Sequence, residues 1–198
     1  GLCCYISRFL ITRDFIQMRS SLAILVIIFA SKYIYEKKMW KYFAFLLVAY
    51  QFHHLALLGI PLYFINKIHI TDKFIVFGLV LALVGSQLFA GPISGYLENY
   101  SEDLNYVTYM QGQYVEEALG LKNPMIYFQI VILMMFTFFE PRLYKMSNYY
   151  YLYRNGYFYS TFILILFFNY TALSGRTSTI FATYEIFILP MIAKAIPK

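Results

Sequence analysis

Residues 39–66 have the sequence MWKYFAFLLVAYQFHHLALLGIPLYFIN, and the length of this apolar stretch decides how the chain folds. No charged residue lies between Lys41 and Lys67. Two adjacent histidines, His53 and His54, stand in its middle. A single helix of this length would be about 42 Å long, whereas the hydrocarbon core of a membrane is roughly 30 Å thick. The helix must therefore either tilt steeply or break.

The basic residues on both sides of this stretch favour the break. The flanking loops carry more lysines than acidic residues: Lys37, Lys38, Lys41, Lys67 and Lys73 against Glu36 and Asp72. Because basic loops stay on the cytoplasmic side, both ends of the stretch are predicted to be cytoplasmic. We expect two short helices that meet near His53, toward the outer leaflet, where irregular backbone must be buried in protein or line a wet cavity. A single tilted span, with both histidines facing the helix bundle, is the alternative.

The composition indicates an integral membrane protein. Of the 198 residues, 61% are hydrophobic and only 13% are charged, whereas a soluble domain has about 25% charged residues. We therefore predict an all-α fold, a multi-pass transmembrane helical bundle that forms a single integral-membrane domain over residues 1–198. The net charge of +6 marks membrane orientation and does not indicate nucleic-acid binding. Because Gly1 opens inside an apolar run without an initiator methionine, we expect a fragment of a longer chain.

Further membrane spans follow from the apolar segments and from the charges between them. They are expected at residues 14–35, 73–91, 124–140, 157–174 and 177–196. The acidic stretch 92–123 is predicted to be an outer loop that contains a surface helix. Residues 141–156, a basic segment that includes Arg154, are predicted to be an inner loop. Gly175 and Arg176 are expected to form a tight outer turn.

The basic residues differ between the two predicted sides of the membrane. Most inner ones are lysines, whereas the outer ones are mostly arginines, namely Arg13, Arg19 and Arg176. Arginine on the outer side works against the positive-inside bias, so another role should retain it. Its planar guanidinium binds phosphate through two parallel hydrogen bonds and stays charged. These arginines and His53 therefore predict an outer pocket for an anionic amphiphile such as a lipid-linked diphosphate.

Each of these residues also has a purely structural interpretation. A single arginine near a helix end commonly extends to the membrane surface as an anchor. His53 and His54 would equally serve as hydrogen-bonding residues inside the bundle. Glu185, within the last predicted span, is expected to have a buried partner such as an arginine, because an isolated carboxylate is costly at membrane depth. The two cysteines, Cys3 and Cys4, are adjacent and lack metal-ligand spacing, so no metal site is predicted.

Three segments resemble the EpsG/Wzy-type polysaccharide polymerases: FIQMRSSLAI at 15–24, YIYEKKMWKYF at 33–43 and AYQFHHLALLGIPLYFI at 49–65. Arg19 matches the arginine of that pattern, and His53, not His54, matches its histidine. A later segment, LSGRTSTIFATYEIFILP at 173–190, resembles the Gly-Arg of the family followed by an aromatic helix, with Arg176 as the arginine. The chain departs from the family pattern at Ser20, Leu55 and Ile180, where glutamine, serine and tyrosine are usual.

The resemblance implies a GT-C-like membrane glycosyltransferase of the bacterial inner membrane. Such an enzyme joins oligosaccharide repeat units linked to undecaprenyl diphosphate into O-antigen, capsule or exopolysaccharide on the outer face. The diphosphate-binding residues would be Arg19, Arg176 and Arg13. The catalytic residue would be His53, acting as a base, with His54 and Glu185 in support. The implied partners are membrane lipid, a chain-length regulator and a flippase, with no cofactor, metal or nucleic acid.

Three other functions fit the same residues. A transporter or flippase of lipid-linked glycans also attracts diphosphate with arginines, but it should show paired, inverted halves with interrupted helices. An O-antigen ligase shares the chemistry of the polymerase. The third alternative is a non-catalytic membrane subunit, but this role does not explain why arginines lie on the outer side.

Overall fold

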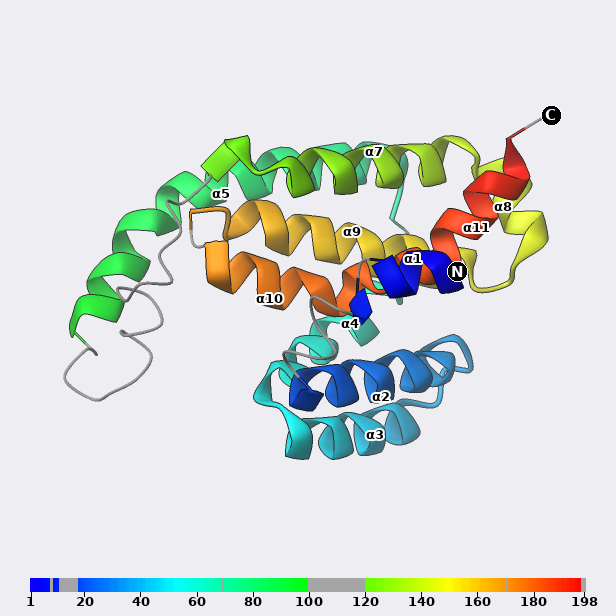
Figure 1. Ribbon diagram of the computed structural model, residues 1–198, viewed down its shortest axis with the longest axis horizontal. Helices are drawn as coiled ribbons and strands as arrows, with labels where there is room; N and C mark the ends of the chain where they lie inside the picture. Colours follow the sequence, from blue (N-terminus) through cyan, green and yellow to red (C-terminus); the bar gives the residue numbers. More distant parts are fainter. Residues whose placement is uncertain (8, 11–17, 69, 100–119, 170, 197–198) are drawn as a thin grey trace.

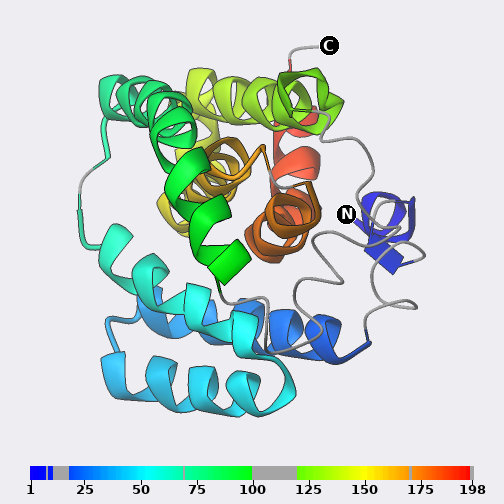
Figure 2. The same ribbon diagram turned by 90° about the vertical axis from the view of Figure 1, so that its left-hand side faces the viewer.

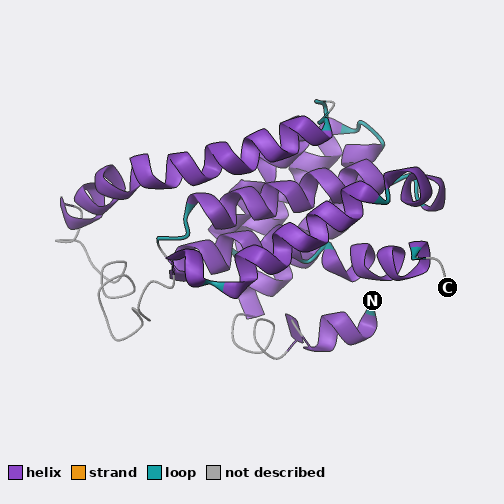
Figure 3. Ribbon diagram, turned by 90° about the horizontal axis from the view of Figure 1, so that it is seen from above, coloured by secondary structure: helices purple, strands orange, loops and turns teal. Residues whose placement is uncertain are grey.

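The computed structural model describes residues 1–7, 9–10, 18–68, 70–99, 120–169 and 171–196. The described residues form an all-α fold, as predicted. The α-helices are α1 (Leu2–Tyr5), α2 (Met18–Tyr35), α3 (Met39–Phe52), α4 (Gly59–Ile65), α5 (Asp72–Asn99), α7 (Pro124–Phe138), α8 (Glu140–Met146), α9 (Tyr150–Leu166), α10 (Thr171–Ala182) and α11 (Glu185–Ala195). Two 3₁₀ helices, η2 (His54–Leu58) and η3 (Gly120–Lys122), complete the described elements. Figure 3 shows how little of the described chain lies outside helices.

Helix α9 lies at the centre of the molecule. It packs against α5, α7 and α10, and it also contacts α2, α4, α8 and α11. Figures 1 and 2 show α2 and α3 packed as an antiparallel pair along one side of this central group. Most side chains of α9 are buried. Its Gly156 lets Tyr184 pack directly on the backbone, since a Cβ there would lie 2.4 Å from Cε2 of Tyr184.

The described helices include candidates for membrane spans. By length and hydropathy, α2 can cross a membrane alone. Two bent pairs also qualify when each is counted as one span. These are α7 with α8, bent by 80°, and residues Ser174–Ala182 with α11, bent by 55°. The described residues therefore contain one to three candidate spans.

The predicted break near His53 is confirmed. Helix α3 ends at Phe52, His53 has extended backbone (φ −158°, ψ 129°), and the chain continues into η2 and α4. The two arms fold back on each other, because the buried hydroxyl of Tyr42 in α3 donates a hydrogen bond of 2.7 Å to the carbonyl of Gly59. Tyr42 also stacks on Tyr63 of α4, with ring centroids 5.7 Å apart. The stretch is therefore a hairpin and not a single tilted span.

The expected inner loop 141–156 is instead largely helical. Helix α8 covers Glu140–Met146, and α9 already begins at Tyr150. Pro141 stands in the first turn of α8, where a proline removes no intrahelical hydrogen bond. Arg154 therefore lies inside a helix, with 1% of its surface exposed, rather than in a basic surface loop.

The expected tight turn at Gly175 and Arg176 is also wrong. Both residues lie within α10, and the chain turns earlier, directly after α9 ends at Leu166. Glycine is common in membrane helices, so it did not have to mark a turn. The hydroxyls of Ser178 and Thr179 donate hydrogen bonds back to the carbonyl of Gly175, a pattern that these residues form inside helices. The bend comes later, between α10 and α11.

Two expectations fall partly or wholly outside the described residues. Helix α5 continues to Asn99, so the first part of the expected outer stretch 92–123 is helical. The remainder up to residue 119, with most of the predicted surface helix, lies outside the described residues. Arg13 also lies outside them.

The ends of successive helices lie alternately at two opposite ends of the molecule, in the order that the charges predicted. In Figure 1, one end of the molecule gathers the start of α2, the junction of α3 with η2, the far end of α5 and the start of α10. We call it the histidine end. The opposite end gathers the turn between α2 and α3, the link between α4 and α5, the α7–α8 bend and the last turn of α11. We call it the Arg154 end. That the histidine end faces outward stays a prediction.

Positions 41 and 67 are expected to be labelled from the same side of the membrane. The stacking of Tyr42 on Tyr63 brings the end of α4 to the level at which α3 begins. Lys41→Cys and Lys67→Cys should therefore both react with a membrane-impermeant maleimide in inside-out vesicles, and neither should react in intact spheroplasts.

The background for this labelling is the full-length protein with Cys3 and Cys4 replaced by serine, because a thiol at either position would also react with the maleimide. Lys122→Cys, in η3 at the histidine end, is the control and should react only in spheroplasts. Labelling of positions 41 and 67 from opposite sides would contradict the hairpin.

Candidate functional site

His53, the predicted catalytic residue, lies at the break between α3 and η2. Its Nδ1 accepts a hydrogen bond of 3.1 Å from the backbone N–H of Leu55. Its own backbone N–H donates a hydrogen bond to the carbonyl of Ala49, so that His53 caps the end of α3. The His53 ring stacks on that of His54, with centroids 4.5 Å apart and an interplanar angle of 28°. The His53 side chain thus caps η2 through Nδ1, half-buried beside the exposed His54.

Arg176 acts electrostatically on His53, although the two residues are far apart in the sequence. Burial lowers the pKa of His53 most, and the neighbouring His54 and the guanidinium of Arg176 lower it further. Arg176 is exposed in the middle of α10.

Arg19 belongs to the same end of the molecule. It is exposed in the first turn of α2, and the next two residues, Ser20 and Ser21, are buried. Helix α2 packs against η2, and Figures 1 and 2 show its first turn at the histidine end. The structure therefore places the first turn of α2, which carries Arg19, and the break at His53 at the same end of the molecule.

Glu185 is fully buried in the first turn of α11. The hydroxyl of Tyr157 in α9 donates a hydrogen bond of 2.7 Å to its Oε1. This described partner is a tyrosine, where the sequence suggested an arginine. A carboxylate is also favoured at a helix N-terminus by the helix dipole. Glu185 therefore ties α11 to the central helix. In the part of the chain that the structure describes, no three His, Cys, Asp or Glu side chains gather as metal ligands.

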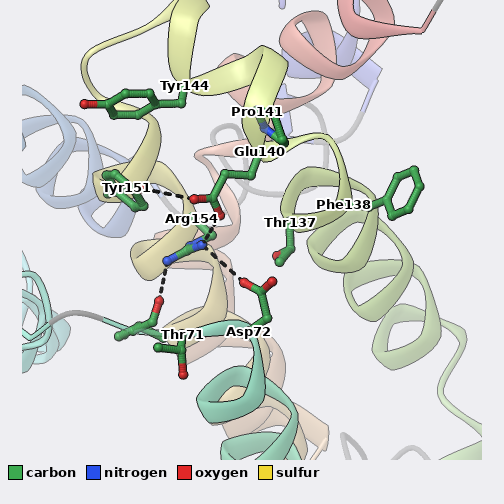
Figure 4. Close-up of a pocket in the computed structure, with 10 residues that line it drawn as sticks. Thr71, Asp72, Thr137, Phe138, Glu140, Pro141, Tyr144, Tyr151 and Arg154 are labelled. Carbon is green, nitrogen blue, oxygen red and sulfur yellow. Dashed lines mark hydrogen bonds and ion pairs between the residues drawn. The ribbon is translucent and has the colours of Figure 1, made fainter.

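A second polar cluster surrounds Arg154 at the opposite end (Figure 4). Nη1 of Arg154 lies 2.7 Å from Oε2 of Glu140 and 3.6 Å from Oδ1 of Asp72. Nη2 donates a hydrogen bond to the carbonyl of Ile70. The hydroxyl of Tyr151 donates to Oε1 of Glu140 at 3.0 Å, and the guanidinium carbon lies 5.0 Å from the centroid of the Tyr151 ring. The buried cation is thus held by two carboxylates, a carbonyl and an aromatic face.

A cavity of about 580 Å³ opens beside the Arg154 cluster. Its walls come from the link between α4 and α5, the start of α5, the α7–α8 bend and α9. Because Arg154 bonds to groups from three of these segments, the cluster fastens them together. The positive charge of Arg154 is compensated by protein groups, which is the arrangement of a structural ion cluster.

Sequence reasoning missed this cluster because it counted Arg154 among the basic residues of an inner loop. A signal was present in the sequence. This signal is a helical spacing of four and then three positions, which joins Tyr150, Arg154 and Tyr157. All three are fully or almost fully buried in α9.

Comparison with known proteins gives one match. The model of the EpsG family matches residues 1–198, the whole of the chain. A search of curated proteins and a search of solved structures each found no match.

Proposed function

The chain belongs to the EpsG family, which is associated with exopolysaccharide synthesis, and we propose that it is a polysaccharide polymerase. Its donor is an oligosaccharide repeat unit linked to undecaprenyl diphosphate. The reaction takes place at the outer face of the bacterial inner membrane, and its product is an O-antigen, a capsule or an exopolysaccharide.

One observation carries this proposal: the long apolar stretch breaks at His53, at the end of the molecule where α2 begins with the exposed Arg19. Arg19 is exposed in the first turn of α2, at the same end as this break, and Arg176 is exposed in α10. Fixed guanidinium groups around an interrupted apolar segment suit an anionic head attached to a long lipid chain, because the head meets cations while the chain stays in the bilayer.

The reaction needs such an arrangement of charge. A sugar hydroxyl of one glycan attacks the anomeric carbon of another glycan, which is linked to the lipid diphosphate. A carbon–oxygen bond forms, the bond from the anomeric carbon to the phosphate oxygen breaks, and the lipid diphosphate leaves with the electron pair. Preorganised cations stabilise the negative charge that develops on the leaving oxygen, and they act most strongly where water is excluded.

Two alternatives share parts of this arrangement. An O-antigen ligase uses the same bond chemistry with a different acceptor. A transporter of lipid-linked glycans gains some support from the structure, because two helix pairs besides the hairpin are bent, by 80° and 55°. A histidine at the break of the hairpin favours the polymerase, since a transporter needs no group that acts on the bond at the diphosphate.

Reconstitution separates the three functions. Full-length protein in liposomes receives an undecaprenyl-diphosphate-linked repeat unit, and the glycan products are separated by size on a gel. A polymerase produces a ladder of longer chains, which is the expected result. A transporter moves the donor between leaflets without lengthening it, and a ligase leaves the donor unchanged until a lipid acceptor is added. Restoration of long polymer in a deletion strain by the full-length gene is the matching test in cells.

A further inference from the structure

We propose that His53 acts as a hydrogen-bond donor, through the N–H at Nε2, to an anionic oxygen of the bound diphosphate, and not as a general base. This inference rests on the proposed function for its ligand. Its starting point is the hydrogen bond from the backbone N–H of Leu55 to Nδ1 of His53. A neutral imidazole has one nitrogen that donates and one that accepts. Because Nδ1 accepts, the proton of the neutral ring lies on Nε2, which is then a donor.

The local fold maintains this tautomer. His53 is the N-cap of η2, and the amide of Leu55 lies in the first turn of that helix, where no carbonyl of the helix itself can accept from it. If the proton were on Nδ1, this hydrogen would point at the hydrogen of the Leu55 N–H, and Nδ1 could no longer accept the hydrogen bond. Nε2 becomes an acceptor, and hence a base, only when this cap is lost. The contact uses the backbone of Leu55, so the departure from the usual serine at this position leaves it intact.

The surroundings also disfavour a base. A base takes up a proton in the transition state and becomes an imidazolium. Among the described residues, His54 on η2 and Arg176 on α10 act on His53, and both disfavour a positive charge on its ring. The guanidinium of Arg176 also attracts an anion. A neutral donor at Nε2 therefore adds to the field of the arginines, whereas an imidazolium base would form against it.

This role changes the route of one proton in the reaction. The attacking sugar hydroxyl loses its proton as its oxygen bonds to the anomeric carbon. The proton passes to an oxygen of the departing diphosphate, which takes the electron pair of the broken bond. His53 keeps its own proton throughout. The hydrogen bond from its N–H to the diphosphate becomes shorter as negative charge develops on the diphosphate.

The tautomer can be measured without any activity. Full-length protein with ring-¹⁵N-labelled histidines is placed in lipid nanodiscs, and the His53 signals are identified by their loss in His53→Gln. We expect the NMR spectrum at neutral pH to show a protonated Nε2 and an unprotonated Nδ1. A proton on Nδ1 would overturn the proposal.

The second test compares His53→Gln with His53→Ala in the polymerisation assay, at equal amounts of folded protein. The amide nitrogen of glutamine can reach the place of Nε2 and donate, but glutamine cannot act as a base. We expect His53→Ala to lose about a hundredfold in rate, as for other preorganised donors, and His53→Gln to stay within about tenfold of the wild type. Equal, large losses in both variants would overturn the donor role.

The pH dependence gives an independent comparison. A histidine base loses rate about tenfold per pH unit below its pKa, because only the unprotonated form works. A donor at Nε2 keeps its proton at any such pH, so the wild type and His53→Gln should have profiles of the same shape between about pH 5 and about pH 8. An acid limb that is present in the wild type and absent in His53→Gln would overturn the donor role.

Failure of the proposed function would look different. The probe for it is farnesyl diphosphate, a short lipid diphosphate, whose binding to the wild-type protein is measured by calorimetry. A wild type that neither binds this probe nor lengthens a glycan would overturn the polymerase and, with it, the donor role. An active wild type whose His53 carries its proton on Nδ1 would overturn the donor role alone.

Discussion

Arg19→Ala and Arg176→Ala are each expected to lower the polymerisation rate about a hundredfold, equivalent to about 3 kcal/mol of transition-state stabilisation. Arg19 is exposed in the first turn of α2 at the histidine end, and the charge of Arg176 acts on His53. Each removal takes a fixed cation away from the place where the leaving diphosphate gains charge. The measurement is the rate of glycan lengthening in liposomes, together with polymer length in cells at matched protein level.

Lysine should not rescue Arg19. An ammonium keeps the charge but cannot form the two parallel hydrogen bonds that a guanidinium makes with phosphate oxygens. Arg19→Lys is therefore expected to stay well below the wild type in the same assay, although above Arg19→Ala. His54→Ala should lose less than His53→Ala, because Nδ1 of His53 caps η2, whereas the exposed His54 ring stacks on His53.

The matched control for these variants is Arg142→Ala. Arg142 is another exposed arginine, but its Nη1 donates to the carbonyl of Ala195 in α11, which ends at the Arg154 end. Its removal should leave the polymerisation rate within a few fold of the wild type. Long polymer of normal length in both Arg19→Ala and Arg176→Ala would rule out the diphosphate site. A loss in Arg142→Ala as large as theirs would mean that the assay reports folding and not the site.

The sequence was sufficient for the hairpin and insufficient for the packing around it. The break near His53 could be predicted because an apolar stretch of this length must tilt steeply or break in a bilayer, and lysines at both ends favour the break. The stacking of Tyr42 on Tyr63 could not be predicted. It depends on which faces of the two arms meet, and the even distribution of apolar residues along both arms does not specify a face.

Gly175 and Arg154 show why the other boundaries were misplaced. Both expectations used residue type alone, glycine for a turn and arginine for an inner loop. In an apolar bundle a glycine also allows close helix packing, and a charged residue can be buried when carboxylates compensate it. The spacing of Arg154 between buried tyrosines of α9 was the better guide, because helical periodicity reports burial more directly than charge does.

The largest loss of stability is expected from Glu140→Gln, about 3–5 kcal/mol in the free energy of unfolding. The side chain of Arg154 is 2% exposed, and Glu140, 2.7 Å from its Nη1, is the nearer of its two carboxylates. Neutralising Glu140 leaves a buried cation with only Asp72 at 3.6 Å, whose side chain is 70% exposed. The measurement is unfolding of the purified protein in detergent with increasing denaturant.

Asp72→Asn is the matched control, because it makes the same change from carboxylate to amide in the same cluster. A solvent-exposed ion pair contributes only about 0–1 kcal/mol, so this variant should be close to the wild type. Arg154→Leu should fall between the two. It removes the buried charge itself and leaves carboxylates that water can reach, since the side chain of Glu140 is 31% exposed.

The double variant Glu140→Gln, Arg154→Leu then decides whether an unpaired buried charge is the cause. If it is, removing the cation as well should restore part of the stability lost in Glu140→Gln, because the cost of burying an uncompensated guanidinium disappears. A double variant less stable than both single ones would instead assign the loss to packing of the arginine stem in α9. Equal losses in Glu140→Gln and Asp72→Asn would contradict the dominant role of the 2.7 Å pair.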